Sequence, residues 1–337
     1  MAPSVLSVEN LVVDYKTARG TVRAVDGVSF DVPKGAVVGL VGESGCGKTT
    51  VARAITGVLH ASARISGGRL NFGGKDLISG PARDWLDARW RQISFVPQSA
   101  MNSLDPVYRV GAQIEEVLIH RGGSGRAQAR ARAAELFVMV GLDPARLGEY
   151  PHQFSGGMRQ RVAIALALAL NPALVIADEP VTALDVIVQR QILDVIRDLQ
   201  RRLSLSMILV THDISVVAYV CDRVVVMYAG RIVESGPAAD VLERPNHPYT
   251  MGLMNAFPDL ENAAHELAPI EGSPPDLLTP PNGCRFAPRC PFAQARCVAD
   301  SPMTETPAPG TAIACHRQAD VSMMRARARE TATWQLS

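Results

Sequence analysis

A glycine-rich segment followed by lysine and threonine is the part of this sequence whose residue types are best suited to chemistry. Residues 42–49 read GESGCGKT and fit the pattern G-x4-G-K-[ST] in full, which is typical of phosphate-binding loops. Glycines allow backbone N–H groups to close around phosphate oxygens, Lys48 supplies a positive charge, and the Thr49 hydroxyl can bind Mg²⁺. The alternative is a glycine-rich turn in which the lysine is incidental. The residues that we expect to surround the phosphates are Gly42, Glu43, Ser44, Gly45, Cys46, Gly47, Lys48, Thr49 and Thr50.

Two carboxylates and a histidine follow apolar runs of the kind that form buried strands. Asp178 and Glu179 come directly after the run at residues 174–177, and His212 follows the run at residues 206–210. Next to phosphates, Asp178 can bind Mg²⁺, and Glu179 is suited to act as general base for a water that attacks the γ-phosphate. His212 is suited to stabilise the transition state or to position that water. Without the phosphate loop, the acidic pair would be interpreted as an exposed turn and the histidine as structural.

The elements that must position these side chains alternate between strands and helices. Continuous apolar runs predict buried strands, and helical patterns follow at residues 49–59 and 189–203. Strands that alternate with helices indicate an α/β sheet that is covered on both faces. The buried strands are expected at residues 36–41, 174–177, 206–210 and 223–228.

Other parts of the chain show different patterns. Residues 5–15 and 22–32 alternate between apolar and polar side chains, which predicts half-buried strands, and residues 67–72 resemble a short edge strand. The pattern from residue 85 to residue 169 is mostly helical, with breaks at Gly and Pro, and it includes a predicted helix over residues 126–139.

The composition is that of an ordinary globular protein. The chain has 337 residues, of which 47% are apolar and 20% charged, so it is long enough for about two domains or one domain with an extension. A net charge of +1 argues against a broad surface for nucleic acid. The longest apolar run, residues 162–170, is far shorter than the ~20 residues that cross a bilayer, and no signal peptide opens the sequence. We therefore expect a soluble, cytoplasmic protein.

A second segment with the character of an anion-binding site lies at residues 154–161, which read FSGGMRQR. A serine and two glycines before a helix combine a hydroxyl, exposed amides and the helix dipole. The segment is similar to the signature of the ATP-binding cassette ATPases, usually written LSGGQ, with Phe and Met in place of the first and last residues. This resemblance implies a head-to-tail dimer in which one subunit caps the ATP bound in its partner's loop. The capping residues would be Ser155, Gly156, Gly157 and Met158.

Further positions match the same family in order along the chain. Tyr15 resembles the aromatic residue that stacks on adenine, and the alternative is a strand tyrosine that packs in the core. Gln98 resembles the glutamine that joins the two lobes and contacts Mg²⁺ or the attacking water. Asp185 resembles part of the loop that couples the two sites of the dimer. Val181 departs from the threonine that close relatives often have there, and we expect no loss of hydrolysis from it.

The resemblance narrows to the D-type ATPase subunits of dipeptide and oligopeptide importers. The segments that carry it are residues 157–161, 226–230, 247–250 and 272–276, together with the cysteines near the C-terminus. It implies that the protein hydrolyses ATP with Mg²⁺ to energise the import of dipeptides or oligopeptides. The alternatives are the same role in the import of nickel chelates, opines or oligosaccharides, and a non-transport ATPase with a regulatory iron–sulfur site.

The resemblance also implies partners and an architecture. The partners would be two permease subunits, a second ATPase of the F type and an extracytoplasmic solute-binding protein, which places the chain at the cytoplasmic face of the membrane. A P-loop NTPase core of the RecA-like α/β type, with an antiparallel β subdomain and a helical subdomain at about residues 99–170, is expected in residues 1–240. Residues 241–337 are expected to form a small Pro- and Cys-rich C-terminal extension, because over half of the 23 prolines lie after residue 236.

Four of the six cysteines gather in this extension, at Cys284, Cys290, Cys297 and Cys315. A cytosolic chain seldom keeps disulfides, and these spacings are wider than the cysteine pairs of structural zinc sites. We therefore predict that the four thiols bind a [4Fe–4S] cluster, with Zn²⁺ or free thiols as the alternatives. Metal, more than an apolar core, is then expected to hold the extension together. Arginines interleaved with the thiols are expected to lower the pKa of the thiols: Arg285, Arg289, Arg296 and Arg317.

Overall fold

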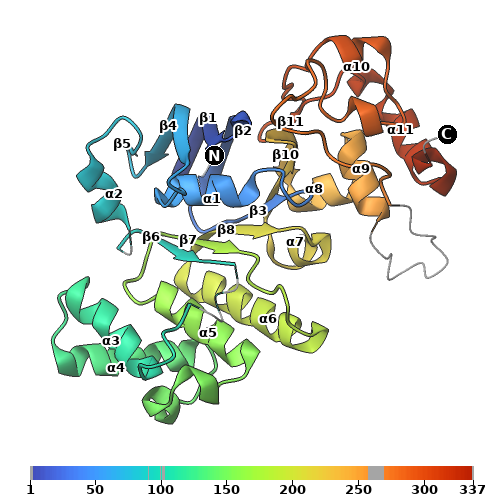
Figure 1. Cartoon of the computed structure of the whole chain (residues 1–337). Helices are drawn as coiled ribbons and strands as arrows, with labels where there is room; N and C mark the ends of the chain where they lie inside the picture. The colour runs from blue at the N-terminus through green and yellow to red at the C-terminus, as the bar shows by residue number, and fades with distance from the viewer. Residues whose placement is uncertain (1–2, 90, 99, 101–102, 257–268, 336–337) are drawn as a thin grey trace.

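Two β-sheets with a helix between them organise the chain (Figure 1). The structure is a computed structural model that describes residues 3–89, 91–98, 100, 103–256 and 269–335. The central sheet has seven strands in the order β11-β10-β9-β3-β8-β7-β6, and the second sheet has four strands in the order β2-β1-β4-β5. Apolar residues of α1 (Lys48–Thr56), among them Val51 and Ile55, share one core with both sheets.

Five neighbouring parallel strands make up the central sheet as far as one of its edges. They are β3 (Val37–Val41), β6 (Ile93–Val96), β7 (Leu174–Asp178), β8 (Ser206–Thr211) and β9 (Arg223–Tyr228). Every residue of β3, β7 and β8 is buried, which confirms the prediction from their apolar runs. The prediction of a mostly helical pattern from residue 85 onward is wrong at β6. A run of four residues is too short for its periodicity to distinguish a strand from a helix.

Alternate residues of the parallel strands face different layers of helices. Val175 and Ala177 of β7 pack in the same core as α5 (Gly156–Ala167) and α6 (Val186–Leu203), whereas Ile176 packs in the core that contains α1. The sheet is therefore covered on both faces, as its alternation with helices predicts. α7 (Ile214–Val220) follows β8 and precedes β9.

The second sheet is antiparallel and confirms the expected half-buried strands. Its strands are β1 (Ser4–Thr17), β2 (Gly20–Pro33), β4 (Ala63–Phe72) and β5 (Lys75–Asp76). Leu6, Val8, Leu11 and Val13 of β1 are buried and face α1, while the residues between them are more exposed. The sheet therefore closes the core above the phosphate loop's helix.

A group of helices lies at the opposite end of the molecule from the C-terminal residues (Figure 1, green). It contains α3 (Val110–His120) and α4 (Arg126–Met139), the latter at the position predicted. Shorter elements of this group are η2 (Pro144–Gly148) and η3 (Pro151–Gln153). α2 (Ala82–Ala88) lies instead beside the antiparallel sheet (Figure 1), and its Ala88 is buried in the core that contains α1. The predicted helical subdomain begins at residues 99 and 101–102, which lie outside the described residues.

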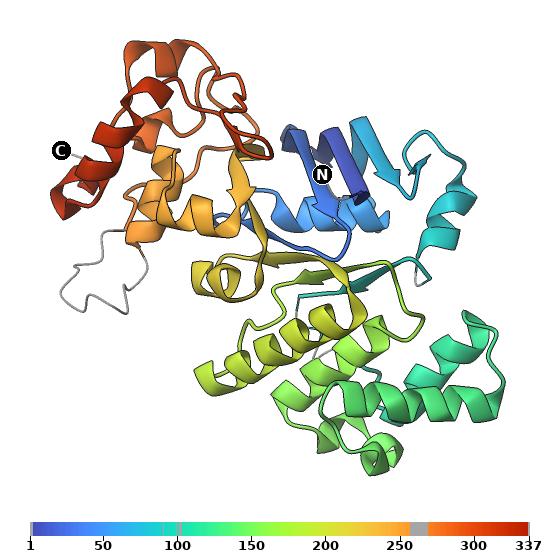
Figure 2. The same ribbon diagram turned by 180° about the vertical axis from the view of Figure 1, so that it is seen from behind.

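The C-terminal region joins the edge of the central sheet (Figure 2). β11 (Ala312–Ile313) pairs antiparallel with β10 (Arg231–Pro237), which in turn pairs with β9. Its other elements are α8 (Ala238–Glu243), α9 (Pro248–Asn255), η4 (Ala287–Arg289), α10 (Ala295–Ala299), η5 (Gln318–Asp320), α11 (Val321–Ala328) and η6 (Thr331–Trp334). Parts of the predicted extension, residues 257–268 and 336–337, lie outside the described residues.

An apolar core holds this region against β9, so the prediction that metal more than core holds it is wrong for the described residues. Tyr228 of β9, Tyr249 of α9 and Phe286 pack ring against ring with centroids 4.7–5.4 Å apart. Met324 and Trp334 are buried in the same cluster. Aromatic side chains bury large areas, and a few of them suffice for a small core. Within the described ranges, no helix is both long and apolar enough to cross a membrane.

Candidate functional site

The loop between β3 and α1 has backbone conformations that only glycine adopts without strain. Gly42 has φ +148° and Gly47 has φ +104°. A Cβ on Gly42 would lie 2.1 Å from the carbonyl oxygen of Met227, and one on Gly47 would lie 2.4 Å from that of Ala24. Any side chain at either position would force the loop away from the neighbouring backbone. The loop ends directly at the N-terminus of α1, the arrangement that the motif requires for phosphate binding.

The Lys48 ammonium lies along this loop. Its Nζ donates to the carbonyl oxygens of Gly42 at 2.7 Å and Glu43 at 2.9 Å, and the residue is only 5% exposed. Cys46 Sγ lies 3.7 Å from the same Nζ, and burial raises the pKa of that thiol. The positive charge is thus confined to the loop without a carboxylate partner within salt-bridge distance among the described residues. A confined, unneutralised ammonium is suited to phosphate oxygens.

Thr49 and Asp178 bring two side-chain oxygen atoms together at the end of the phosphate loop. Thr49 Oγ1 donates to Asp178 Oδ1 at 3.2 Å, and Asp178 is 1% exposed at the end of β7. Asp178 Oδ2 is buried and has no hydrogen-bond partner among the described residues. Burial raises the pKa of Asp178, and the hydrogen bond from Thr49 and the charges of Arg53 and Lys48 offset this only in part. A buried carboxylate oxygen without a partner, beside a hydroxyl, fits the oxygen-ligand preference of Mg²⁺.

Glu179 is held by side chains from three separate parts of the chain. Gln98 Nε2 donates to Oε2 at 2.8 Å, Thr182 Oγ1 donates to Oε2 at 3.1 Å, and His212 Nδ1 lies 3.1 Å from Oε1. Burial by itself would raise the pKa of Glu179. The hydrogen bonds of His212 and Thr182 outweigh it and bring the pKa below its usual value. The carboxylate is therefore ionised near neutral pH, the state that a general base needs.

The structure brings most of the predicted catalytic residues together at the carboxyl ends of the parallel strands of the central sheet. β3, β6, β7 and β8 are parallel neighbours, so the residues that follow them meet at their carboxyl ends. Thr182 is a contact that the sequence analysis missed. The available sequence signal was a hydroxyl side chain three residues after Glu179. In the structure, Glu179 has a φ of +48°, and this turn of the backbone brings Thr182 back to the Glu179 carboxylate.

Tyr15 lies within reach of the helix that follows the loop. Its hydroxyl is 3.2 Å from Thr50 Oγ1, and its ring is partly buried against the core between the two sheets. This position is compatible with both interpretations of the residue, stacking on a base and packing in the core, and the prediction of adenine stacking stays a prediction.

The predicted signature segment begins α5. Ser155 is the N-cap residue, and its side chain accepts from the backbone N–H of Met158 at 3.3 Å. A Cβ on Gly157 would lie 2.4 Å from Val188 Cγ1, and the N–H of Val188 donates to the Asp185 carboxylate at 2.9 Å. The signature segment therefore packs closely against the first turn of α6, which the Asp185 side chain caps. No hydrogen bond between described residues joins residues 155–158 to the chain's own phosphate loop.

Two further side chains, both missed by the sequence analysis, contact the phosphate loop from the C-terminal region. Tyr249 Oη accepts from the backbone N–H of Glu43 at 2.8 Å, and Arg289 pairs with the Glu43 carboxylate at 2.8 Å. Tyr249 lies in one of the segments that carried the resemblance, which was the available signal. Arg289 was noticed only for its place among the cysteines.

The four cysteines of the C-terminal region line one small cavity of about 10 Å³, together with His316. Burial raises the pKa of the Cys284 and Cys290 thiols, and raises the pKa of the Cys315 thiol to about 11. No group of three or more Cys, His, Asp or Glu in the described parts of the chain has the geometry to hold a metal ion. The prediction of an iron–sulfur cluster is therefore unsupported by the structure.

The interleaved arginines do not bring the pKa of Cys284, Cys290 or Cys315 below its usual value. Arg317 does lower the pKa of the Cys315 thiol, as predicted, but burial outweighs it. Arg289 is turned toward Glu43, and Arg285 pairs with Asp26 at 2.6 Å. Arg317 pairs with Asp320 at 2.7 Å. Each of these arginines pairs with a carboxylate, and burial is the largest influence on the pKa of the three thiols.

Comparisons with known sequence families agree with this geometry. Residues 25–182 match the family described as ABC transporter. Residues 233–297 match the family described as the C-terminal region of oligopeptide/dipeptide transporters.

Individual relatives cover nearly the whole chain. The dipeptide transport ATP-binding protein DppD of Bacillus subtilis is 48% identical over 87% of this chain and 88% of its own length. The oligopeptide transport ATP-binding protein OppD of Salmonella typhimurium is 45% identical over 93% of both chains.

Solved structures match the nucleotide-binding part. A dimeric ATP-binding cassette in a post-hydrolysis state, bound to ADP and Pi, is 28% identical with a TM-score of 0.62 and covers 69% of this chain and 98% of its own. The cbiO1 protein of Clostridium perfringens, part of an ABC transporter complex, is 27% identical with a TM-score of 0.61 and covers 71% of this chain and 91% of its own.

Proposed function

This chain belongs to the ATP-binding proteins of ABC transporters, and from that membership we propose that its ATPase activity drives the import of dipeptides or oligopeptides. The ATPase assignment rests on the family and is supported by the loop, Lys48 and the held Glu179. The observation that carries the peptide assignment is the match of residues 233–297 to the C-terminal region of oligopeptide/dipeptide transporters, alongside the cassette match in the same chain. The names of the relatives point to the same class of cargo.

The proposed hydrolysis uses the side chains gathered at the carboxyl ends of the parallel strands. Glu179 accepts a proton from water while the water oxygen forms a bond to the γ-phosphorus. The bond from that phosphorus to the β–γ bridging oxygen breaks, and ADP leaves with the electron pair of that bond. Lys48 and the loop N–H groups stabilise the negative charge of the phosphates. Gln98 and His212 hold the Glu179 carboxylate, so it needs no reorientation as the water approaches.

Mg²⁺ would be held by Thr49 and Asp178, with Gln98 as the further predicted contact. When bound, the ion supplies positive charge to the phosphate oxygens. Because Asp178 Oδ2 is buried and has no hydrogen-bond partner in the described part of the chain, an ion bound with ATP would supply the contact that this oxygen lacks. This arrangement makes the affinity for the nucleotide dependent on the side chain at position 178.

The proposed assembly is a head-to-tail dimer of ATPases on two permease subunits, with an external solute-binding protein. In it, Ser155, Gly156, Gly157 and Met158 cap the ATP of the partner, and Asp185 couples the two sites. The second ATPase would be a related F-type subunit, and the complex would place this chain at the cytoplasmic face of the membrane. The dimeric state of a matched cassette structure supports the pairing. The close packing of Gly157 against Val188, in the helix turn that Asp185 caps, supports the coupling.

Metal binding at the four cysteines is kept as a separate proposal. Its support is the convergence of Cys284, Cys290, Cys297 and Cys315 on one cavity. Binding would require deprotonation of Cys284, Cys290 and Cys315, which burial opposes by raising their pKa. It would also require the four thiols to move from their present geometry. Iron, sulfide and zinc analysis of anaerobically purified protein, with its visible absorption spectrum, tests this. Stoichiometric iron and sulfide support a [4Fe–4S] cluster, zinc alone supports the alternative, and neither metal leaves free thiols.

Peptide import is tested by uptake of labelled dipeptides and oligopeptides in cells that carry the intact transporter. We expect uptake to be lost when Glu179→Gln replaces the native chain and kept with the surface variant Glu135→Gln, whose side chain is 61% exposed. Ligands released from the co-purified solute-binding protein then identify the cargo. Recovery of a nickel chelate, an opine or an oligosaccharide in place of peptide would overturn the peptide assignment while keeping the ATPase. Wild-type membranes without any coupled uptake would favour a non-transport ATPase.

A further inference from the structure

The second residue of the phosphate loop is held from outside the loop by two side chains of the C-terminal region. The backbone N–H of Glu43 donates to Tyr249 Oη at 2.8 Å, and the Glu43 carboxylate accepts from Arg289 Nη1 at 2.8 Å. Glu43 and Arg289 are 246 residues apart in sequence. Because its N–H is engaged by Tyr249, Glu43 contributes no free amide to the phosphate cradle. Its side chain faces Arg289 of the C-terminal region.

Arg289 is fixed so firmly that it can act as a support. Its side chain is 6% exposed, its Nε and Nη2 donate to the carbonyl oxygens of Glu271 and Ile270 at 2.9 and 3.0 Å, and its Nη1 also donates to Tyr228 Oη at 3.2 Å. Burial would lower the pKa of this guanidinium, but the hydrogen bonds to Glu43 and Tyr228 outweigh it and raise the pKa. A buried arginine in this setting stays charged, and its planar fork fixes the direction in which Glu43 is held.

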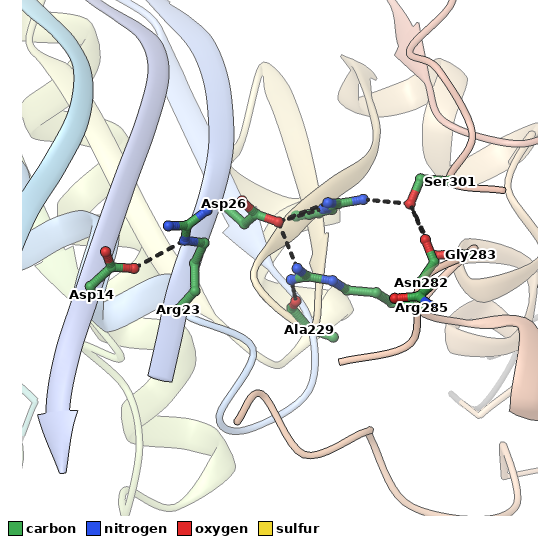
Figure 3. A network of polar contacts seen from close by, with 9 residues as sticks. Asp14, Arg23, Asp26, Ala229, Asn282, Gly283, Arg285 and Ser301 are labelled. Carbon is green, nitrogen blue, oxygen red and sulfur yellow. Dashed lines mark hydrogen bonds and ion pairs between the residues drawn. The ribbon is translucent and has the colours of Figure 1, made fainter. Parts of the chain in front are cut away.

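A second arginine of the same region makes a different attachment (Figure 3). Arg285 lies between the Asp26 carboxylate, at 2.6 Å, and the carbonyl oxygen of Ala229. Asp26 also pairs with Arg231, which in turn donates to Ser301 Oγ at 3.0 Å. This network ties the C-terminal region to the strands beside the loop. The contacts of Arg289 and Tyr249, in contrast, act on a residue of the loop itself.

We propose that Arg289 and Tyr249 are positioning residues that hold the phosphate loop in its nucleotide-binding conformation through Glu43. Glycines at positions 42, 45 and 47 give this loop a large conformational entropy when it is free. Contacts from outside the loop that fix Glu43 reduce the conformational entropy that the loop loses when ATP binds. ATP therefore binds more tightly, although these contacts add no interaction with the phosphates. The effect should fall on nucleotide affinity and spare the chemical step, because neither side chain contacts Glu179. The inference concerns the ATP site and does not depend on which solute is transported.

The test measures binding of trinitrophenyl-ATP to the purified full chain, and kcat at saturating ATP in the assembled transporter. We expect Arg289→Ala and Glu43→Ala each to weaken nucleotide affinity by about tenfold, the usual size for a hydrogen bond to a charged group, with kcat within about twofold. The double variant should be no weaker than either single variant, because both remove the same contact. Arg289→Lys should restore only part of the affinity, since an ammonium lacks the fork. Tyr249→Phe should weaken affinity by about threefold.

Glu43→Ala guards against a trivial result, since Arg289→Ala removes several bonds and could unfold the C-terminal region. Arg317→Ala is the matched control, because Arg317 pairs with Asp320 and donates to the Phe292 carbonyl within that region, away from the loop. We expect its nucleotide affinity to equal that of the native chain. Unchanged affinity in Glu43→Ala would overturn the proposal. So would an equal loss of affinity in Arg317→Ala, or additive losses in the double variant, since both indicate general damage to the region.

Discussion

The phosphate loop and the cysteine-lined cavity are both candidate ligand sites, and the structure has prepared them to very different degrees. At the loop, Gly42 and Gly47 admit no side chain, Lys48 is fixed by two carbonyls, and Glu179 is held by three partners. At the cavity, burial raises the pKa of Cys284, Cys290 and Cys315, and no group of described residues has the geometry to hold a metal ion. At the loop, this chain's own contribution to the site is already in position, whereas the cysteine site would have to be reorganised by a ligand.

The difference shows what each kind of sequence signal specifies. The loop motif specifies backbone conformations, because its glycines exclude every other residue at those φ values. The cysteine spacing specifies only that four thiols lie close along the chain. Their geometry depends on the surrounding core of Tyr228, Tyr249 and Phe286, which the spacing does not encode. If the two regions are independent, substitutions at the nucleotide site should change ATP binding or hydrolysis, and substitutions in the aromatic core should change stability.

The largest effect is expected at the general base. Glu179→Gln should lower the ATPase rate of the assembled transporter by about 10²–10⁴-fold, because an amide cannot accept the proton of the attacking water. ATP affinity should change little, since Glu179 contacts other side chains and not the loop. Glu135→Gln, on the surface of α4, serves as the matched control. Turnover at the native rate in the Glu179 variant would remove Glu179 from the mechanism.

The next effect is expected in the core of the C-terminal region. Phe286→Ala should lower the free energy of unfolding by about 3–5 kcal/mol, because Phe286 is 1% exposed and contacts both buried tyrosines. Thermal unfolding checks this, with Val298→Ala as a control whose side chain is 68% exposed in the same region. The loss should be the same with and without a chelator. If Phe286→Ala lowers the free energy of unfolding only when a chelator is present, bound metal, and not the aromatic core, stabilises this region.

These two predictions also mark how far the sequence alone could lead. Continuous apolar runs predicted β3, β7, β8 and β9, because a strand buried on both faces leaves that pattern. The strand at Ile93–Val96 was missed because four residues carry no period. The pairing of Arg289 with Glu43 could not be predicted either. It joins residues 246 positions apart, and local spacing holds no information about such a contact.

Within the loop, two glycines should respond differently to the same substitution. Gly42→Ala places a Cβ 2.1 Å from the Met227 carbonyl oxygen, whereas a Cβ on Gly45 meets nothing within 4 Å. Both positions have positive φ, so Gly45→Ala should raise the free energy of the loop's binding conformation by about 1 kcal/mol through backbone strain alone. Gly42→Ala should weaken ATP affinity by at least about tenfold more, because the loop must also move. Equal affinities in nucleotide-binding measurements would contradict a loop that is fixed by its neighbours.

The smallest effect is expected at Tyr15, where two interpretations remain open. If the ring stacks on adenine, Tyr15→Ala should weaken ATP affinity by about fivefold, the size of one aromatic contact, with little change in thermal stability. Tyr15→Phe should bind ATP within about twofold of the native chain, because it keeps the ring and loses only the contact of the hydroxyl with Thr50 Oγ1. If the ring instead serves the core between the sheets, Tyr15→Ala should lower the unfolding temperature and leave affinity unchanged. Measuring both quantities on both variants therefore decides whether the antiparallel sheet belongs to the prepared nucleotide site or only supports it.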